Sequence, residues 1–304
     1  MWNEINKRAV LISDIGILFL TKMCKWEINL KKLYLLILAL FLIPSITLAE
    51  IITENRWDSL NSNGWWMSRE LGVVETISDS TAPDPHNVLR FTYPAGFTND
   101  GNSPGLVGIE LGSVAPTELW VQFWFKYSSN YIPQITANKI YYITNHVAQD
   151  AGAPDANNIL VLTTSGSLIP RLGIAGGVAT LYGNVNNGAN FHISKGVWHK
   201  MVTYQHVNSN GNDGVFRMWI DDVMYFDYTG LPFRISSKFG GKDIFDGFKF
   251  DPVYGGANPS QPNLPADQYF YIDETIISTT PISGGNKSIP TMIPSPPKNL
   301  IIGQ

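Results

Sequence analysis

The feature that most constrains the fold is a set of short runs in which apolar and polar residues alternate. In the run Gly214–Ile220, Phe216 and Met218 fall on one side of an extended chain, while Arg217 and Trp219 fall on the other. After residue 50 there is no heptad and no long 3.6-residue periodicity. Clusters of Gly, Pro, Asn and Asp separate the runs, as is typical of strands joined by turns.

The alternating and apolar runs predict eleven strands, which is too many for one open sheet. Two antiparallel sheets stacked as a β-sandwich accommodate this number. The 27 Gly, the 19 Pro and an aromatic fraction of 12% also fit an all-β domain rich in turns. The predicted strands are Val73–Ser78, Val88–Tyr93, Leu106–Leu111, Glu118–Tyr127, Lys139–Ile143, Ile159–Thr164, Arg171–Ile174, Trp198–Val207, Gly214–Ile220, Asp246–Phe250 and Tyr269–Ser278.

The first 49 residues are predicted to be a secretory leader with an overlong start before Met23. A Lys-Lys pair at 31 and 32 precedes an apolar run at 33–46, and the small residues that a signal peptidase reads end at Ala49. The alternative is a membrane anchor, but a span needs about 20 apolar residues and this run is shorter. We therefore expect cleavage near Ala49, no stable membrane anchor afterwards, and a location that is secreted, periplasmic or on the cell surface.

Removing residues 1–49 makes the rest of the chain more acidic. The leader holds six of the 21 Lys and Arg and three of the 25 Asp and Glu, leaving 15 basic against 22 acidic residues. This balance argues against a nucleic-acid partner. The only cysteine, Cys24, lies in the leader, so a disulfide is not expected. We expect one β-sandwich at 50–280, followed by a Pro/Gly-rich tail or linker at 281–304.

Five segments, taken in order, carry a resemblance to a known superfamily. They are ELWVQFWFKYSSNY, NKIYYI, KGVWHKMVTYQHVNSNGNDGVFRMWIDD, FDGFKFDPVYGG and QYFYIDETIIS. Their order resembles the concanavalin A-like lectin/glucanase superfamily, especially secreted bacterial laminin G-like proteins and jelly-roll polysaccharide lyases. The resemblance implies a concanavalin A-like jelly roll over about residues 55–278. It does not fix the activity, because this fold hosts lectins, hydrolases, lyases and adhesive modules.

In these relatives the ligand lies across the concave sheet, so the resemblance implies a polysaccharide on the polar face of the central strands. Aromatic rings pack on the C–H faces of sugars, while Arg and Lys bind hydroxyls or carboxylates. The favoured function is therefore lectin-like carbohydrate binding. The predicted binding residues are Trp120, Gln122, Trp124, Lys126, Arg171, Arg217 and Trp219.

Glycoside hydrolysis is disfavoured. A retaining glucanase of this superfamily carries Glu-x-Asp-x-x-Glu on one strand, because two carboxylates about 5 Å apart must flank the scissile bond. The sequence has no such spacing.

The alternative function is a polysaccharide lyase that cleaves a uronate-containing glycan by β-elimination. This reaction needs a group that neutralises the uronate carboxylate, a base and an acid. The sequence lacks the Arg-rich and Gln-Ile-His strands of jelly-roll alginate lyases, and has Lys-Ile-Tyr at 139–141 in the place of the second. The predicted catalytic residues are Lys139, Tyr141 and Tyr254, with His146, Arg171 and Arg217 available beside them. Ordinary strand packing is the alternative for Tyr141 and its neighbour Tyr142.

Calcium is the only cofactor that the sequence suggests. Asp273, with Asp58 or Glu54, is predicted to form a structural Ca²⁺ site, which needs six to eight oxygen ligands. The oxygen-rich loop at 150–157 is better explained by turns in which Asp and Asn bind their own backbone. No His/Cys cluster suggests zinc.

A third function is an adhesive or structural surface module without sugar specificity. It predicts that Trp124 and Trp219 are covered by a loop or by each other. A lyase instead should place a carboxylate-binding Arg or Gln beside a Tyr or His.

Overall fold

The computed structural model describes the central part of the chain, within the compact unit Ala49–Gln304. The described residues are 51–60, 63–69, 71–84, 86–98, 102–111, 116–144, 157–164, 167–174, 179–207, 213–231, 233, 245–255 and 262–282. The predicted leader and nearly all of the predicted tail lie outside them. Over these ranges, no helix has the length and apolar character needed to cross a bilayer.

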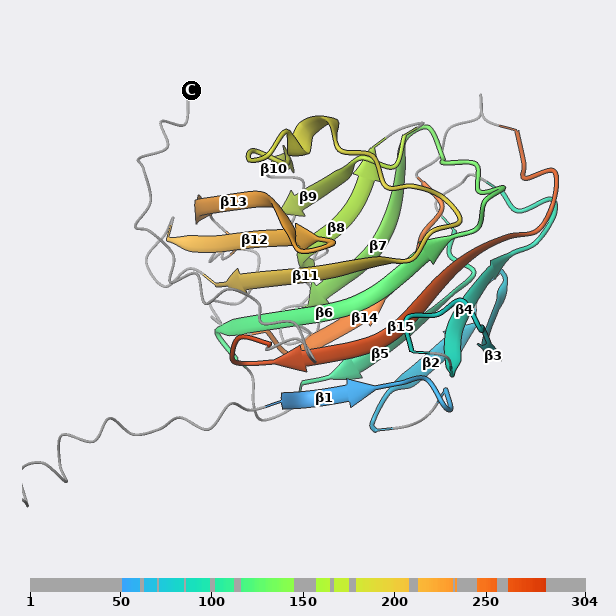
Figure 1. The fold of residues 1–304 in the computed structure, drawn as a ribbon, viewed down its shortest axis with the longest axis horizontal. Coiled ribbons are helices and arrows are strands. Elements are labelled where there is room, and N and C mark those ends of the chain that lie inside the picture. Colours follow the sequence, from blue (N-terminus) through green and yellow to red (C-terminus); the bar gives the residue numbers. More distant parts are fainter. Residues whose placement is uncertain are drawn as a thin grey trace, which may run out of the picture. The chain divides into compact units, whose positions relative to one another are not determined.

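The described residues form two antiparallel sheets (Figure 1). The eight strands of sheet A run in the order β13 (Val223–Leu231), β12 (Gly214–Ile220), β11 (His199–His206), β6 (Glu118–Tyr127), β15 (Gln268–Ser278), β4 (Asn87–Tyr93) and β3 (Val73–Ser78), with β1 (Ile51–Asn55) also paired with β15. The seven strands of sheet B run in the order β10 (Ala179–Tyr182), β9 (Pro170–Ile174), β8 (Asn157–Thr164), β7 (Ala137–Thr144), β14 (Gly247–Phe250), β5 (Gly105–Glu110) and β2 (Trp66–Arg69). A short 3₁₀ helix, η3 (Gly188–Asn190), precedes β11.

The eleven predicted strands are all present, and the prediction of an all-β jelly-roll sandwich is confirmed. Four further strands were not predicted: β1, β2, β10 and β13. Three of these, β1, β2 and β10, have only four or five residues, too few to show a period of two clearly.

The core lies between the two sheets and is built from the apolar faces that alternation predicts. Phe123 of β6 packs edge-on against Phe250 of β14, with ring centroids 5.1 Å apart. The hydroxyl of Tyr141, on β7, crosses the core and donates a hydrogen bond to Thr203 of β11 at 2.8 Å. These four residues are fully buried. The residues that alternate with them therefore lie on the outer faces of the sheets.

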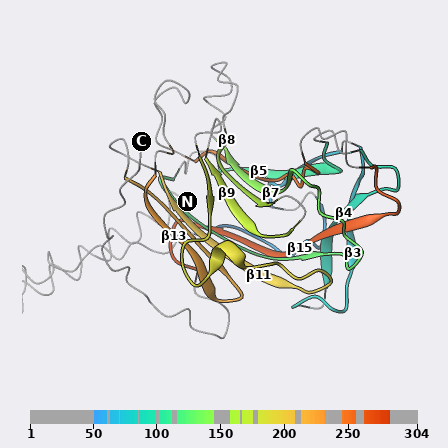
Figure 2. The same cartoon turned by 90° about the horizontal axis from the view of Figure 1, so that it is seen from above.

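The strands of sheet B are bowed. In Figure 2, β7, β8 and β9 bend along their length, and their hollow side is turned away from β11, β13 and β15 of sheet A. The outer face of sheet B is therefore the concave outer face in this part of the molecule.

Candidate functional site

The structure divides the predicted site residues among three places. The outer face of sheet A carries those of β6 and β12: Trp120, Gln122, Trp124, Lys126, Arg217 and Trp219. The outer face of sheet B carries Lys139 and Arg171, on β7 and β9. Tyr141 and Tyr254 belong to the core. The predicted residues therefore do not form one binding surface.

On sheet A the aromatic rings cover one another. The ring of Trp120 lies 4.7 Å from that of Tyr204 and 5.9 Å from that of Trp219, with an angle of 21° between the two indole planes. The ammonium of Lys200 lies 5.9 Å from the centre of the Trp124 ring. Cross-strand contacts of this kind stabilise a sheet. Trp219 stacks on Trp120 and not on Trp124, which differs from the mutual cover of Trp124 and Trp219 that the adhesive alternative predicts.

The cations of the sheet A outer face lie against carboxylates. The shortest nitrogen–oxygen distances are 2.5 Å for Lys126–Asp79, 2.5 Å for Lys200–Asp222, 2.6 Å for Arg90–Glu75 and 2.8 Å for Arg217–Asp227. Each pair neutralises a positive charge that would otherwise attract an anionic ligand. This face is therefore poorly suited to bind uronate carboxylates.

On sheet B the strand register aligns three polar side chains in one row across four strands. Lys139 is opposite Leu162 of β8, Leu162 is opposite Arg171 of β9, and Arg171 is opposite Tyr182 of β10. Directly opposed residues of antiparallel strands project to the same face. We call Lys139, Arg171 and Tyr182 the Lys139 row; it spans about 14 Å, or three strand spacings.

A β-bulge gives Lys139 its place in this row. The register of β7 against β8 shifts between Lys139 and Tyr141. Ile140 and Tyr141 consequently both face the core, whereas Lys139 and Tyr142 both face outward, with the ammonium of Lys139 5.8 Å from the centre of the Tyr142 ring. An extra residue in one strand re-aims the side chains beside it in this way.

The two cations of the Lys139 row are held by specific contacts. The Arg171 guanidinium lies 6.0 Å from the centre of the Tyr182 ring and donates a hydrogen bond to the carbonyl oxygen of Thr136 at 3.2 Å. Burial lowers the pKa of Lys139, the nearby charge of Lys249 lowers it further, and Asp251 opposes the shift. A half-buried lysine whose pKa is lowered is a candidate for a functional site.

Lys249 of this face was missed by sequence reasoning, besides Tyr182 of the row itself. Tyr142 of β7 is opposite Lys249 of β14, and the Lys249 ammonium lies 5.0 Å from the Tyr142 ring centre and 3.8 Å from Asp251. Alternation in the run GFKF places Lys249 outward from Phe248 and Phe250. The sequence therefore predicts that Lys249 faces outward, but it does not predict that β14 pairs with β7.

The predicted catalytic tyrosines lie in the interior. The Tyr141 hydroxyl is bonded to Thr203, and burial raises its pKa. Tyr254 is fully buried among aromatic rings, including that of Tyr93 at 5.9 Å, and its hydroxyl donates to the carbonyl oxygen of Ile132 at 3.0 Å. Neither hydroxyl therefore lies on the outer face of a sheet.

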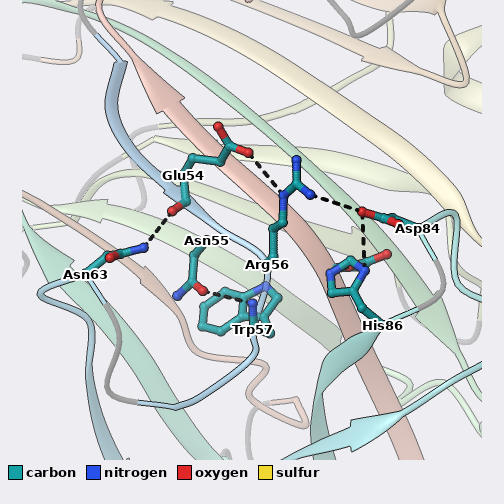
Figure 3. A network of polar contacts seen from close by, with 8 residues as sticks. Glu54, Asn55, Arg56, Trp57, Asn63, Asp84 and His86 are labelled. Atoms are coloured by element: carbon teal, nitrogen blue, oxygen red, sulfur yellow. Dashed lines mark hydrogen bonds and ion pairs between the residues drawn. The ribbon is translucent and has the colours of Figure 1, made fainter.

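Asp273 is buried beside a histidine. Nε2 of His86 lies 3.3 Å from a carboxylate oxygen of Asp273, and Nδ1 of His86 lies 3.5 Å from Asp84. Figure 3 shows this chain of contacts continuing through Arg56, which bridges Asp84 and Glu54.

Glu54, one of the two partners predicted for Asp273 in the calcium site, is paired with the Arg56 guanidinium, which does not favour it as a calcium ligand. Within the described ranges, no group of three or more His, Cys, Asp or Glu side chains is arranged to hold a metal ion. His146 and the side chains of the loop at 150–157 lie outside the described residues.

Comparison with solved structures shows the fold. The endo-β-1,4-glucuronan lyase of the fungus Trichoderma reesei is 16% identical, with a TM-score of 0.55, covering 76% of this chain and 96% of the lyase. The marine PL-14 alginate lyase of Aplysia kurodai is 13% identical, with a TM-score of 0.54, covering 76% and 100% of the two chains. The cellulose-induced protein Cip1 is 13% identical, with a TM-score of 0.53, covering 77% and 100%.

No protein-family model matches the sequence, and no curated protein matches it either. The structural likeness nevertheless confirms that the chain has the concanavalin A-like jelly-roll fold. At these identities the likeness concerns the fold alone, so the function has to be argued from the residues of this chain.

Proposed function

We propose that the protein is a polysaccharide lyase that cleaves a uronate-containing glycan on the outer face of sheet B. The observation that carries the proposal is the Lys139 row, in which an arginine lies beside a tyrosine and shares a sheet face with a lysine whose pKa is lowered. A lyase is expected to have a carboxylate-binding Arg next to a Tyr. On sheet A, Arg217 also lies 5.8 Å from the Tyr204 ring centre, but its guanidinium is paired with Asp227. Two of the similar structures are themselves lyases, of glucuronan and of alginate, which agrees with the proposal.

The three residues have complementary roles in β-elimination. Arg171 binds the uronate carboxylate and stabilises the negative charge that develops there as C5 loses its proton. Lys139 is the base, since its lowered pKa makes the neutral amine more accessible. Tyr182, whose surface is 43% exposed, donates a proton to the leaving O4 oxygen.

The reaction balances without water. The C5–H and C4–O4 bonds break, a C4=C5 double bond forms, and the proton taken by Lys139 replaces, through solvent, the one given by Tyr182. The product therefore carries an unsaturated uronate at its new non-reducing end.

Lectin-like binding through the sheet A tryptophans has weaker support. Trp120 and Trp219 stack on each other, and Arg217 pairs with Asp227. A carbohydrate-binding role on sheet B alone remains the alternative to catalysis, and it predicts binding without turnover.

The test is to incubate the domain with alginate, glucuronan and neutral glucans while following the ultraviolet absorbance of unsaturated uronates. We expect absorbance to grow with a polyuronate and not with a neutral glucan. In Arg171→Ala, the rate of this growth should be at least about a hundredfold lower. The matched control is Arg217→Ala on sheet A, which should retain the wild-type rate. Binding of a polyuronate without absorbance would replace the lyase by the binding module.

A further inference from the structure

A tryptophan on the edge strand of sheet B lies flat against the outer face of that sheet. Trp65 points inward and stacks on Phe250, so its neighbour Trp66 points outward, where it is directly opposite Gly108 of β5. Trp66 is only partly buried and makes no contact with another aromatic ring among the described residues.

Gly108 allows the Trp66 ring to lie face-down. A Cβ atom at Gly108 would be 2.5 Å from Cζ2 of Trp66, 2.9 Å from Cε2 and 3.0 Å from Cη2. These similar distances place the Cβ position over the ring face. A position beyond the ring edge at Cζ2 would be clearly farther from its two ring neighbours, Cε2 and Cη2, than from Cζ2 itself. One face of the indole therefore covers the glycine, and the other is turned away from the sheet.

The row that begins with Trp66 and Gly108 continues across sheet B towards the strand that carries Lys139. Gly108 is opposite Lys249 of β14, and Lys249 is opposite Tyr142 of β7. Across the strands, Trp66 is therefore three spacings, or about 14 Å, from the strand that carries Lys139. A uronate chain that crosses the strands must therefore be several units long to reach from Trp66 to the Lys139 row.

We infer that Trp66, lying on Gly108, and Lys249 form a distal sugar subsite that binds a hexuronate several units from the cleavage point. The indole face stacks on the C–H face of the pyranose ring, and the Lys249 ammonium binds its carboxylate in exchange for its contact with Asp251 at 3.8 Å. The subsite rests on the proposed function, since its ligand is the same uronate chain. It adds that the site favours long chains over short ones.

The experiment compares trisaccharides and octasaccharides of alginate and of glucuronan. Dissociation constants are measured by calorimetry on proteins that all carry Lys139→Met, a change that stops turnover. KM and kcat are measured on the same variants without Lys139→Met. The variants are Trp66→Ala, which removes the ring, and Gly108→Ala, whose methyl group displaces it. Trp219→Ala on sheet A is the matched control, and the thermal midpoint of each variant checks its folding.

We expect both Trp66→Ala and Gly108→Ala to weaken octasaccharide binding roughly three- to tenfold and to leave trisaccharide binding and kcat unchanged. Lys249→Gln should weaken the octasaccharide as well. Unchanged octasaccharide binding in Trp66→Ala, an equal loss for both lengths, or no octasaccharide binding by the parent protein would overturn the subsite. A length-dependent loss in a protein that forms no unsaturated product would keep the subsite while refuting the lyase.

Discussion

The hydrogen bond between Tyr141 and Thr203 gives the sharpest test that Tyr141 has a structural role. Both residues are fully buried and the two oxygens lie 2.8 Å apart. Tyr141→Phe removes the donor, and Thr203→Val removes the acceptor. Each change leaves one buried hydroxyl without this partner, so each should lower the free energy of unfolding by about 1–3 kcal/mol.

The double variant should lose less than the sum of the two single losses, by about 0.5–1.5 kcal/mol, because the two changes remove the same hydrogen bond. Urea unfolding gives the free energy of unfolding of the wild type, the two single variants and the double variant. The rate of unsaturated-uronate formation is measured on the same samples. We expect kcat of Tyr141→Phe to equal that of the wild type. An additive double variant, or a Tyr141→Phe protein of normal stability that has lost its activity, would refute this reasoning.

Three further predictions concern charged groups. Because burial lowers the pKa of Lys139 below its unfolded value of about 10.4, the folded protein binds fewer protons; stability should rise as pH rises through the folded pKa, and Lys139→Met should remove this increment in pH-dependent melting. Burial raises the pKa of Asp273 from 3.8 to about 6, against the opposing charge of His86, so its contribution to stability should be complete below about pH 4 and be lost as pH rises through about 6; Asp273→Asn should flatten that part of the melting profile. Arg217→Gln breaks a surface pair with Asp227 and should lower the free energy of unfolding by no more than about 1 kcal/mol without changing activity on any polyuronate, whereas a loss of activity would place the substrate on sheet A.

The fold could be predicted because it depends on local patterns. Alternation in β6 and β12 identifies the buried face of each strand, and the order of motifs supplies the arrangement of strands. The side chain that faces the core is determined by its immediate neighbours in sequence, so Phe123 and Phe216 were assigned correctly.

The composition of the site could be predicted only in part, because it depends on which strands pair. Alternation shows that Trp120 and Trp124 share one face of β6, but it does not show whether that face belongs to the same sheet as Arg171. Tyr182 is opposite Arg171 only through the pairing of a four-residue strand. The β-bulge beside Lys139 also departs from strict alternation, since it turns Tyr142 outward and Tyr141 inward.

The most direct test of the central claim is to carry out the cleavage in heavy-oxygen water and to weigh the products by mass spectrometry. Elimination breaks the C4–O4 bond without adding water. We therefore expect each cleavage by the wild-type protein to give no fragment that gains heavy oxygen from the cleavage step, and one fragment that is lighter by one water molecule at its new non-reducing end. Products that have gained heavy oxygen and have no C4=C5 double bond would contradict the account, because they would show hydrolysis.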